Sequence, residues 1–278
     1  MANYTAADVK KLRDATGSGM MDCKKALEDS DGDYDQAVEF LRVKGAKNVG
    51  KRAERTAANG LVALEQKDDR SVVMLELNCE TDFVAKNEKF QALAAELASF
   101  IARTSPQDVP SLLASEYSDG KTVQEVVDEY GAVIGEKTQV GRFVIYEGAY
   151  VASYLHKTDP DLPPSMGVLV ELDTEAPEIG KDLAQQVAAL APTYVSKDDV
   201  PEDVVENERR IAEATAREEG KPEQAMPKII EGRVNGFFKD ATLLGQPFVK
   251  DNKTTVQKVV EDAGVTVRRF ARFKVGES

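Results

Sequence analysis

The stretch Cys79-Glu80-Thr81-Asp82-Phe83-Val84-Ala85-Lys86-Asn87 joins two segments of different hydrophobic periodicity. Residues 73–78 alternate apolar and polar side chains, which predicts a half-buried strand. Residues 90–101 carry apolar side chains at helical spacing, which predicts a helix. A strand-to-helix corner presents side chains outward from a rigid base, and here an aromatic, Phe83, directly follows a carboxylate, Asp82. The corner is therefore a candidate contact site.

The segments on either side of this corner recur later in the chain, in the same order. Residues 75–78 are echoed by 170–173, and residues 122–131 are echoed by 255–264, which is a 133-residue offset. Each copy predicts the order strand, strand, helix, helix, strand, as in an antiparallel sheet with helices on one face. The sequence therefore predicts an α+β fold with a duplicated core.

The duplication sets the domain limits. The first copy spans 56–146 and the second 147–278, and the offset between them grows from 93 to 133 residues, so the second copy holds an insertion of about forty residues. Two charged segments with narrow apolar seams flank a turn at 220–222, which predicts a helical hairpin over about 198–236 that projects into solvent. Two roles are open for this hairpin, self-association and contact with a partner.

Three short helices are predicted in residues 1–45, the first with an apolar stripe that includes Leu12. A bundle of this size is typical of a binding module, because its core is too small for high stability. Met20 and Met21 are adjacent, so they cannot share one core face, and we expect one of them to be exposed. Residues 46–55 form a basic linker.

Composition excludes several classes of function. A net charge of −13 opposes binding to a phosphate backbone, and no aromatic side chains interleave the basic linker, so we expect no direct contact with nucleic acid. No apolar run approaches the roughly 18 residues of a membrane helix, and the N-terminus lacks the features of a secretory signal. Cys23 and Cys79 are too few for a disulfide framework or a zinc site, which favours a reducing cytoplasm.

An enzyme or a nucleotide-binding protein is not favoured. Residues 45–52 approach a phosphate-binding loop, but Arg52 stands where magnesium requires Ser or Thr, so we expect no cofactor. The sole histidine, His156, has no accompanying serine or cysteine motif, and a surface role is the simpler interpretation. An enzyme that uses Cys79 or His156 is the weaker alternative to a binding protein.

Two interpretations compete for Phe83. Phe83, Asn87 and Phe90 would share one face of a continuous helix, which is a common core pattern. The second copy has Thr174-Glu175-Ala176-Pro177-Glu178 at the corner, without an aromatic, so the fold does not require one. We therefore predict an exposed Phe83 that acts as an interface anchor, with Asp82 either capping its own helix or accepting hydrogen bonds from a partner.

Several blocks of sequence resemble the bacterial elongation factor Ts family. They are Leu12-Arg13, Thr16-Gly17, 19–27, 81–86 and 245–249. The resemblance implies a guanine nucleotide exchange factor for elongation factor Tu, with an N-terminal module similar to a ubiquitin-associated domain and a coiled-coil insertion. Some members continue past the final strand with an additional module, and contacts that depend on it are expected to be absent here.

The resemblance also implies site residues. The block that disturbs magnesium and phosphate binding in the GTPase corresponds to Thr81, Asp82, Phe83 and Val84. The residues implied to dock on the partner are Leu12, Met20, Met21 and His156. A protein-binding scaffold without exchange activity is the alternative.

Overall fold

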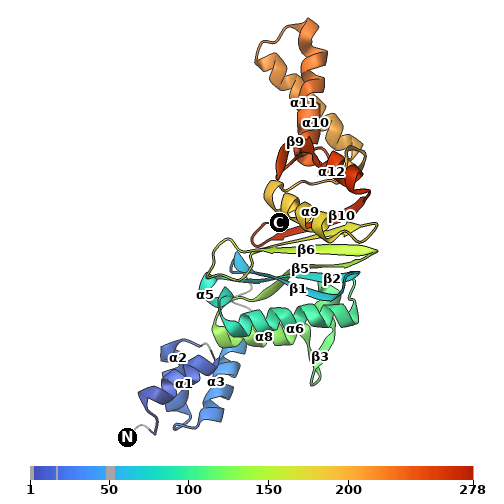
Figure 1. The fold of residues 1–278 in the computed structure, drawn as a ribbon. Helices are drawn as coiled ribbons and strands as arrows, with labels where there is room; N and C mark the ends of the chain where they lie inside the picture. The colour runs from blue at the N-terminus through green and yellow to red at the C-terminus, as the bar shows by residue number, and fades with distance from the viewer. Residues whose placement is uncertain (1–2, 17, 48–53, 278) are drawn as a thin grey trace.

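Three helices form the N-terminal part of the protein (Figure 1). The structure is a computed structural model that describes residues 3–16, 18–47 and 54–277. The helices are α1 (Ala6–Thr16), α2 (Met20–Asp29) and α3 (Tyr34–Lys47). They enclose a small core that contains Leu12, Cys23 and Leu27. Most of the predicted basic linker and of the run resembling a phosphate loop, residues 48–53, lies outside the described residues.

The first copy of the duplicated unit forms a three-stranded antiparallel sheet in the order β1-β2-β5. Its elements are β1 (Asn59–Asp68), β2 (Ser71–Cys79), α5 (Asp82–Ala85), α6 (Glu88–Thr104), α7 (Val109–Ala114), β3 (Glu116–Ser118), β4 (Lys121–Thr122), α8 (Val123–Ile134) and β5 (Gln139–Glu147). Phe90 of α6 and Val127 of α8 are buried in one cluster with Leu75 of β2. The predicted order strand, strand, helix, helix, strand describes β1, β2, α6, α8 and β5, and the structure adds α5, α7 and the β3–β4 pair, which the sequence did not predict.

The second copy repeats this topology, with the central strand β7 between β6 and β10. Its matching elements are β6 (Tyr150–His156), β7 (Met166–Leu172), α9 (Pro177–Leu190), α12 (Val256–Ala263) and β10 (Val267–Lys274). The elements between α9 and α12 are η1 (Lys197–Asp199), α10 (Glu202–Glu218), η2 (Glu223–Ala225), α11 (Met226–Ala241), β8 (Pro247–Phe248) and β9 (Asp251–Thr255). The additional residues therefore fall in the predicted interval between 191 and 255.

Helices α10 and α11 pack against each other and project from the end of the molecule opposite the N-terminal helices (Figure 1). Small and apolar side chains line their contact, including Ala212, Ala216 and Met226, which are buried. Gly220 reverses the chain between them with a φ of 68°, a left-handed conformation that favours glycine. The second helix extends to Ala241, past the predicted limit at 236.

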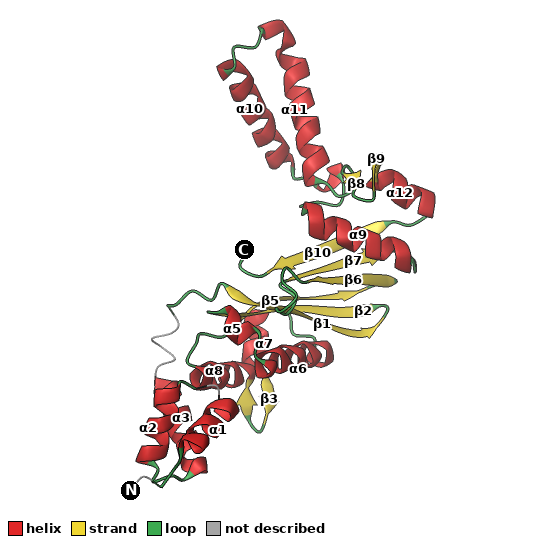
Figure 2. Cartoon of the chain, turned by 60° about the vertical axis from the view of Figure 1, so that its left-hand side comes forward, coloured by secondary structure: helices red, strands yellow, loops and turns green. Residues whose placement is uncertain are grey.

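The two sheets pack face to face, so the helices of each copy cover an outer face (Figure 2). Val72 and Met74 of β2 meet Leu169 of β7 in the cluster between the sheets. Residues 72–79 of β2 are all buried, and the prediction of a half-buried strand is wrong. The reason is that α6 covers one face of β2 while the second sheet covers the other.

An equivalent ion pair links the central and closing strands in each copy. Arg142 of β5 contacts Glu76 of β2 at 2.8 Å, and Arg269 of β10 contacts Glu171 of β7 at 2.5 Å. In both sheets the two partners lie opposite each other in the strand register. The repeat seen in the sequence is therefore a repeat of specific cross-strand contacts.

The helices before the closing strands begin alike and end differently. Thr122 caps α8 and Thr255 caps α12, each accepting a hydrogen bond from a backbone N–H. α12 stops at Gly264, whereas the matching Gly131 lies inside α8, which continues to Gly135. The longer α8 brings the loop that follows it to the end of β2.

Candidate partner-binding site

The corner at residues 79–87 contains a single helical turn, α5, between β2 and α6. Thr81 is the N-cap of α5, and its Oγ1 accepts a hydrogen bond from the Val84 N–H at 3.4 Å. The interpretation that Asp82 caps its own helix is therefore wrong, because Asp82 is the first helical residue. A carboxylate in this first turn still interacts favourably with the helix dipole.

Phe83 projects from the corner and is 81% exposed. Val84 and Ala85, its neighbours, are buried in the core of the first copy. Asn87 caps α6 and ends the helical path between Phe83 and Phe90, so only Phe90 enters the core. The inward-packing interpretation is wrong, and the predicted exposure of Phe83 is confirmed.

Two carboxylates hold the start of the corner against the loop between α8 and β5. Glu136 accepts hydrogen bonds from the Thr81 N–H at 3.0 Å and from the Thr81 hydroxyl at 2.7 Å. Glu80 accepts in return from the Lys137 N–H at 2.6 Å and pairs with Arg55 at 3.3 Å. Thr81 and Glu80, at the base of the corner, are thus held by Glu136 and Lys137, which lie 55 and 57 positions further along the sequence.

The sequence prediction missed Glu136, although a signal for its loop exists. Thr122 and Thr255, at the matching helix starts, are 133 residues apart, whereas Arg142 and Arg269, in the matching closing strands, are 127 apart. The difference of 6 residues means that the first copy has a longer connection between this helix and its closing strand. The greater length of this loop shows that it is a feature of the first copy alone. The length does not predict that the loop contacts Thr81.

Cys79 lies beneath the corner and is fully buried. Its thiol donates a hydrogen bond to the Thr81 carbonyl oxygen at 3.1 Å. The pKa of Cys79 is raised to about 12, chiefly by burial and secondly by the nearby charge of Glu136. Because the thiolate is the reactive form of cysteine, this side chain supports the corner and is unsuited to nucleophilic catalysis.

His156 lies on the surface at the end of β6. Its Nδ1 is 3.0 Å from the Tyr154 hydroxyl, and no other hydrogen bond of its ring occurs within the described residues. The described residues also contain no group of three or more His, Cys, Asp and Glu side chains arranged to bind a metal ion. Among the helices that the structure describes, none is long and apolar enough to cross a membrane.

A second exposed apolar surface lies on α1 and α2. Met20 and Met21 are 45% and 73% exposed, so both are exposed where the sequence predicts one. With Tyr4 and Val9 they line a cavity of about 550 Å³, and we call this the methionine surface. The cations Lys10, Arg13 and Lys24 also line this cavity. Leu12, in contrast, is 0% exposed, and the expectation that it contacts a partner is wrong because α1 directs it into the core.

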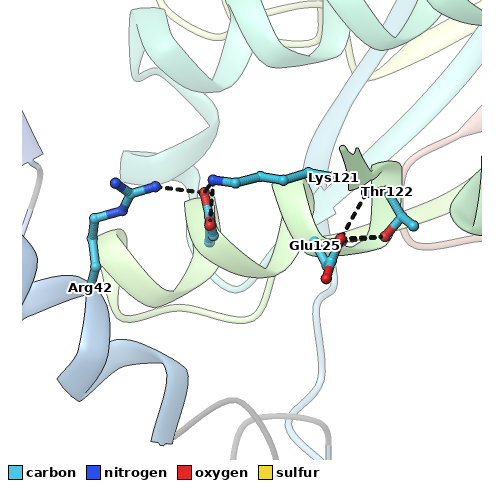
Figure 3. Close-up of polar contacts among 5 residues, drawn as sticks. Arg42, Lys121, Thr122 and Glu125 are labelled. Carbon is cyan, nitrogen blue, oxygen red and sulfur yellow. Dashed lines mark hydrogen bonds and ion pairs between the residues drawn. The ribbon is translucent and has the colours of Figure 1, made fainter. Parts of the chain in front are cut away.

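Polar contacts attach the N-terminal helices to α8. Arg42 of α3 and Lys121 pair with the carboxylate of Glu129 at 2.9 and 2.7 Å. Figure 3 shows these two cations directed at the same carboxylate. Burial raises the pKa of Glu129, but the hydrogen bonds from Lys121 and Arg42 outweigh it and hold that pKa below its usual value. The Ser18 hydroxyl also donates to the Val133 carbonyl oxygen at 2.5 Å. The methionine surface therefore has a defined orientation relative to the corner.

Comparisons with known proteins show which sequences the whole chain resembles. Residues 80–277, which include the corner from its second residue onward, match the family model described as Elongation factor TS. The chain is 75% identical to elongation factor Ts of Thermobifida fusca (strain YX) over 278 residues, which is the full length of both proteins. It is 62% identical to elongation factor Ts of Streptomyces griseus subsp. griseus over 277 residues, covering 99% of this chain and 100% of that protein.

These relatives also cover the three N-terminal helices, which the family model does not reach. Elongation factor Ts of Nocardia farcinica is 60% identical over 281 residues and is likewise covered in full. Since identity of this degree extends through both copies and the N-terminal helices, the chain belongs to the elongation factor Ts family, a family of factors for the elongation phase of protein biosynthesis.

Proposed function

We propose that the chain is a guanine nucleotide exchange factor that binds elongation factor Tu in its GDP-bound and nucleotide-free forms, in the cytoplasm, and promotes replacement of GDP by GTP. The observation that carries the proposal is Phe83, which is 81% exposed on a backbone that Glu136 holds through Thr81. An exposed aromatic on a rigid base is typical of an interface anchor. By the family resemblance, Asp82 and Phe83 are the pair that disturbs magnesium and phosphate binding, with Thr81 and Val84 shaping the corner.

Exchange requires differential binding and no covalent chemistry. A factor that binds the nucleotide-free GTPase more tightly than the GDP-bound form weakens GDP binding by the same ratio. Phe83, inserted beside the phosphate site, supplies this difference in affinity, and Asp82 accepts hydrogen bonds at a helix N-terminus of the partner. In this proposal the chain is not an enzyme and needs no cofactor.

Two further surfaces complete the proposed contact. The N-terminal helices, which we propose to be similar to a ubiquitin-associated domain, bind the GTPase domain through the methionine surface. This surface suits a binding role because flexible thioether side chains adapt to a partner. His156 is a proposed contact of the second copy. The α10–α11 hairpin is the proposed coiled-coil element, and it serves either self-association or contact with the partner.

The experiment that tests the function is the release of fluorescent GDP from elongation factor Tu, followed over time as the chain is titrated. Exchange activity accelerates release in proportion to the complex formed, up to a maximal rate. A chain that binds elongation factor Tu and leaves the release rate unchanged is a scaffold without exchange activity, and the proposal is then wrong.

Met21→Ala is expected to raise the half-saturating concentration of the factor about tenfold, because burying this side chain in a complex contributes about 1.5 kcal/mol or more. The maximal release rate should stay within about twofold, since docking precedes the insertion of Asp82 and Phe83, the pair that we call the wedge. Val43→Ala is the matched control, because Val43 is also exposed on the N-terminal helices but lies outside the methionine surface. An unchanged half-saturating concentration for Met21→Ala contradicts the docking role.

Cys79→Ser is expected to keep the maximal release rate within about threefold of the original, because a serine hydroxyl also donates to the Thr81 carbonyl oxygen. In the folded protein, Cys79 should react with iodoacetamide far more slowly than in urea, since its pKa of about 12 leaves little thiolate at pH 8. Mass spectrometry of the labelled peptides measures this difference. A folded Cys79→Ser variant without activity supports the enzyme alternative instead.

A further inference from the structure

We propose that Glu136 is a positioning residue that sets the direction in which Asp82 and Phe83 point. The inference rests on the proposed function of the corner and adds a residue from outside the four-residue block. It follows from three observations: how Glu136 binds Thr81, how short α5 is, and how the second copy differs.

Both carboxylate oxygens of Glu136 are used on one residue. Oε2 accepts from the Thr81 backbone N–H at 3.0 Å, and Oε1 accepts from the Thr81 hydroxyl at 2.7 Å. The first bond fixes the backbone and the second fixes the side-chain rotamer. Because the same hydroxyl oxygen accepts from the Val84 N–H, the rotamer of Thr81 also sets the start of α5.

α5 cannot hold its own position, because it has only four residues. One turn of helix is unstable by itself, since fixing its dihedral angles costs more than one hydrogen bond returns. The orientation of α5 therefore depends on its anchors. Val84 and Ala85 anchor its inner side in the core, and the bonds of Glu136 anchor its N-terminal end.

Glu80 and Lys137 strengthen the same contact from the opposite direction. The Lys137 N–H donates to Glu80, and Arg55 both pairs with Glu80 and donates to the Gly135 carbonyl oxygen at 3.5 Å. Each loop thus supplies a carboxylate to the backbone N–H of the other, which makes a two-point connection and restricts rotation of the corner.

The second copy lacks both the exposed aromatic and the contact that Glu136 makes with Thr81. There Asp173 accepts directly from the Thr266 N–H at 2.7 Å, and no carboxylate from the short loop 264–266 reaches the corner. Its helix α9 starts after Ala176, which makes no side-chain cap. The same sheet topology therefore closes without a residue like Glu136, and only the copy with the exposed aromatic carries one.

The test is GDP release from elongation factor Tu with Glu136→Ala and Glu136→Gln at 25 °C, where circular dichroism confirms that each variant is folded. Loss of two charge-assisted hydrogen bonds should lower the maximal rate about tenfold for Ala and less for Gln, which keeps one acceptor oxygen. The half-saturating concentration should change by less than about twofold, because docking through the methionine surface is intact. Asp128→Asn is the matched control, because Asp128 lines the same pocket as Glu136 and its substitution removes one negative charge but no hydrogen bond to Thr81, so this variant should retain the original rate.

A double-mutant cycle with Thr81→Ala separates positioning from general stabilisation. If Glu136 acts through Thr81, the loss in the double variant Thr81→Ala/Glu136→Ala should be smaller than the two single losses combined, because both single variants remove the same hydroxyl bond and only the bond to the backbone N–H of residue 81 is left for Glu136. Additive losses, or a folded Glu136→Ala variant with the original maximal rate, overturn the proposal. If the unaltered chain fails to accelerate GDP release, the proposed function itself fails, and that result is distinct from either outcome for Glu136.

Discussion

Phe83→Ala is expected to slow accelerated GDP release from elongation factor Tu about 30- to 150-fold. Burying a phenylalanine side chain contributes roughly 2–3 kcal/mol, and each 1.4 kcal/mol corresponds to a factor of ten. The loss should appear in the maximal rate, because the wedge acts in the bound complex. The free energy of unfolding should change by less than about 0.5 kcal/mol, since Phe83 is 81% exposed and truncation opens no cavity.

Leu190→Ala is the matched control for this variant. Leu190 is a large apolar side chain, 45% exposed, at the end of α9 in the second copy. It should leave the release rate unchanged. Stopped-flow release of fluorescent GDP gives the rates, and thermal unfolding checks the fold. A folded Phe83→Ala protein with the original rate would refute the wedge mechanism and favour the scaffold alternative.

Arg142→Ala is expected to destabilise the protein by about 3–5 kcal/mol, because it leaves the buried carboxylate of Glu76 without its cation. The Glu76 side chain is only 5% exposed, and Arg142 is 2.8 Å from it. Arg142 also donates to the carbonyl oxygens of Lys274 and Glu277 at 3.2 and 2.8 Å, so it joins the first sheet to the end of the second. Urea unfolding followed by circular dichroism measures the change.

The second copy supplies an internal control, Arg269→Ala. Its partner Glu171 is 14% exposed and Arg269 itself 50%, so we expect a smaller loss of about 1 kcal/mol. Each arginine also covers an aromatic ring of the other sheet, Arg142 over Phe273 at 4.5 Å and Arg269 over Tyr146 at 4.1 Å. The stacking contribution is therefore similar in the two variants, and the difference between them reflects burial of the carboxylate together with the two backbone hydrogen bonds of Arg142.

A second substitution tests the cause of the Arg142 effect. If the unpaired charge is responsible, Glu76→Gln should restore part of the stability lost in Arg142→Ala, because a neutral amide costs less to bury. Equal losses for Arg142→Ala and Arg269→Ala, or no recovery with Glu76→Gln, contradict this explanation and point to lost packing instead.

Local patterns predicted the elements of this fold well. Helical spacing identified α6, and the echo of 122–131 in 255–264 identified α8 and α12. Comparing the copies at the corner also predicted that Phe83 is exposed, since the second copy closes without an aromatic. Patterns succeed here because helix and strand periodicity depend on residues a few positions apart.

The N-terminal helices show where a family resemblance and a local pattern disagree. The resemblance implied that Leu12 contacts the partner, whereas its place in the apolar stripe of α1 implied the core, and the core is where it lies. For Met20 and Met21 the local rule allowed one buried side chain. Both are exposed because Cys23, Ala26 and Leu27 already fill that face of α2.

Patterns within the chain were enough to predict the duplication, the order of the main elements, the exposed aromatic at the corner and the family. Two features depend on packing between distant segments: the two sheets stack, which buries β2 on both faces, and Glu136 reaches Thr81 from 55 residues away. Periodicity records which face of an element is apolar, but it does not record what covers that face. The contacts that aim Phe83 arise only when distant loops are brought together by packing, so no local stretch of sequence encodes them.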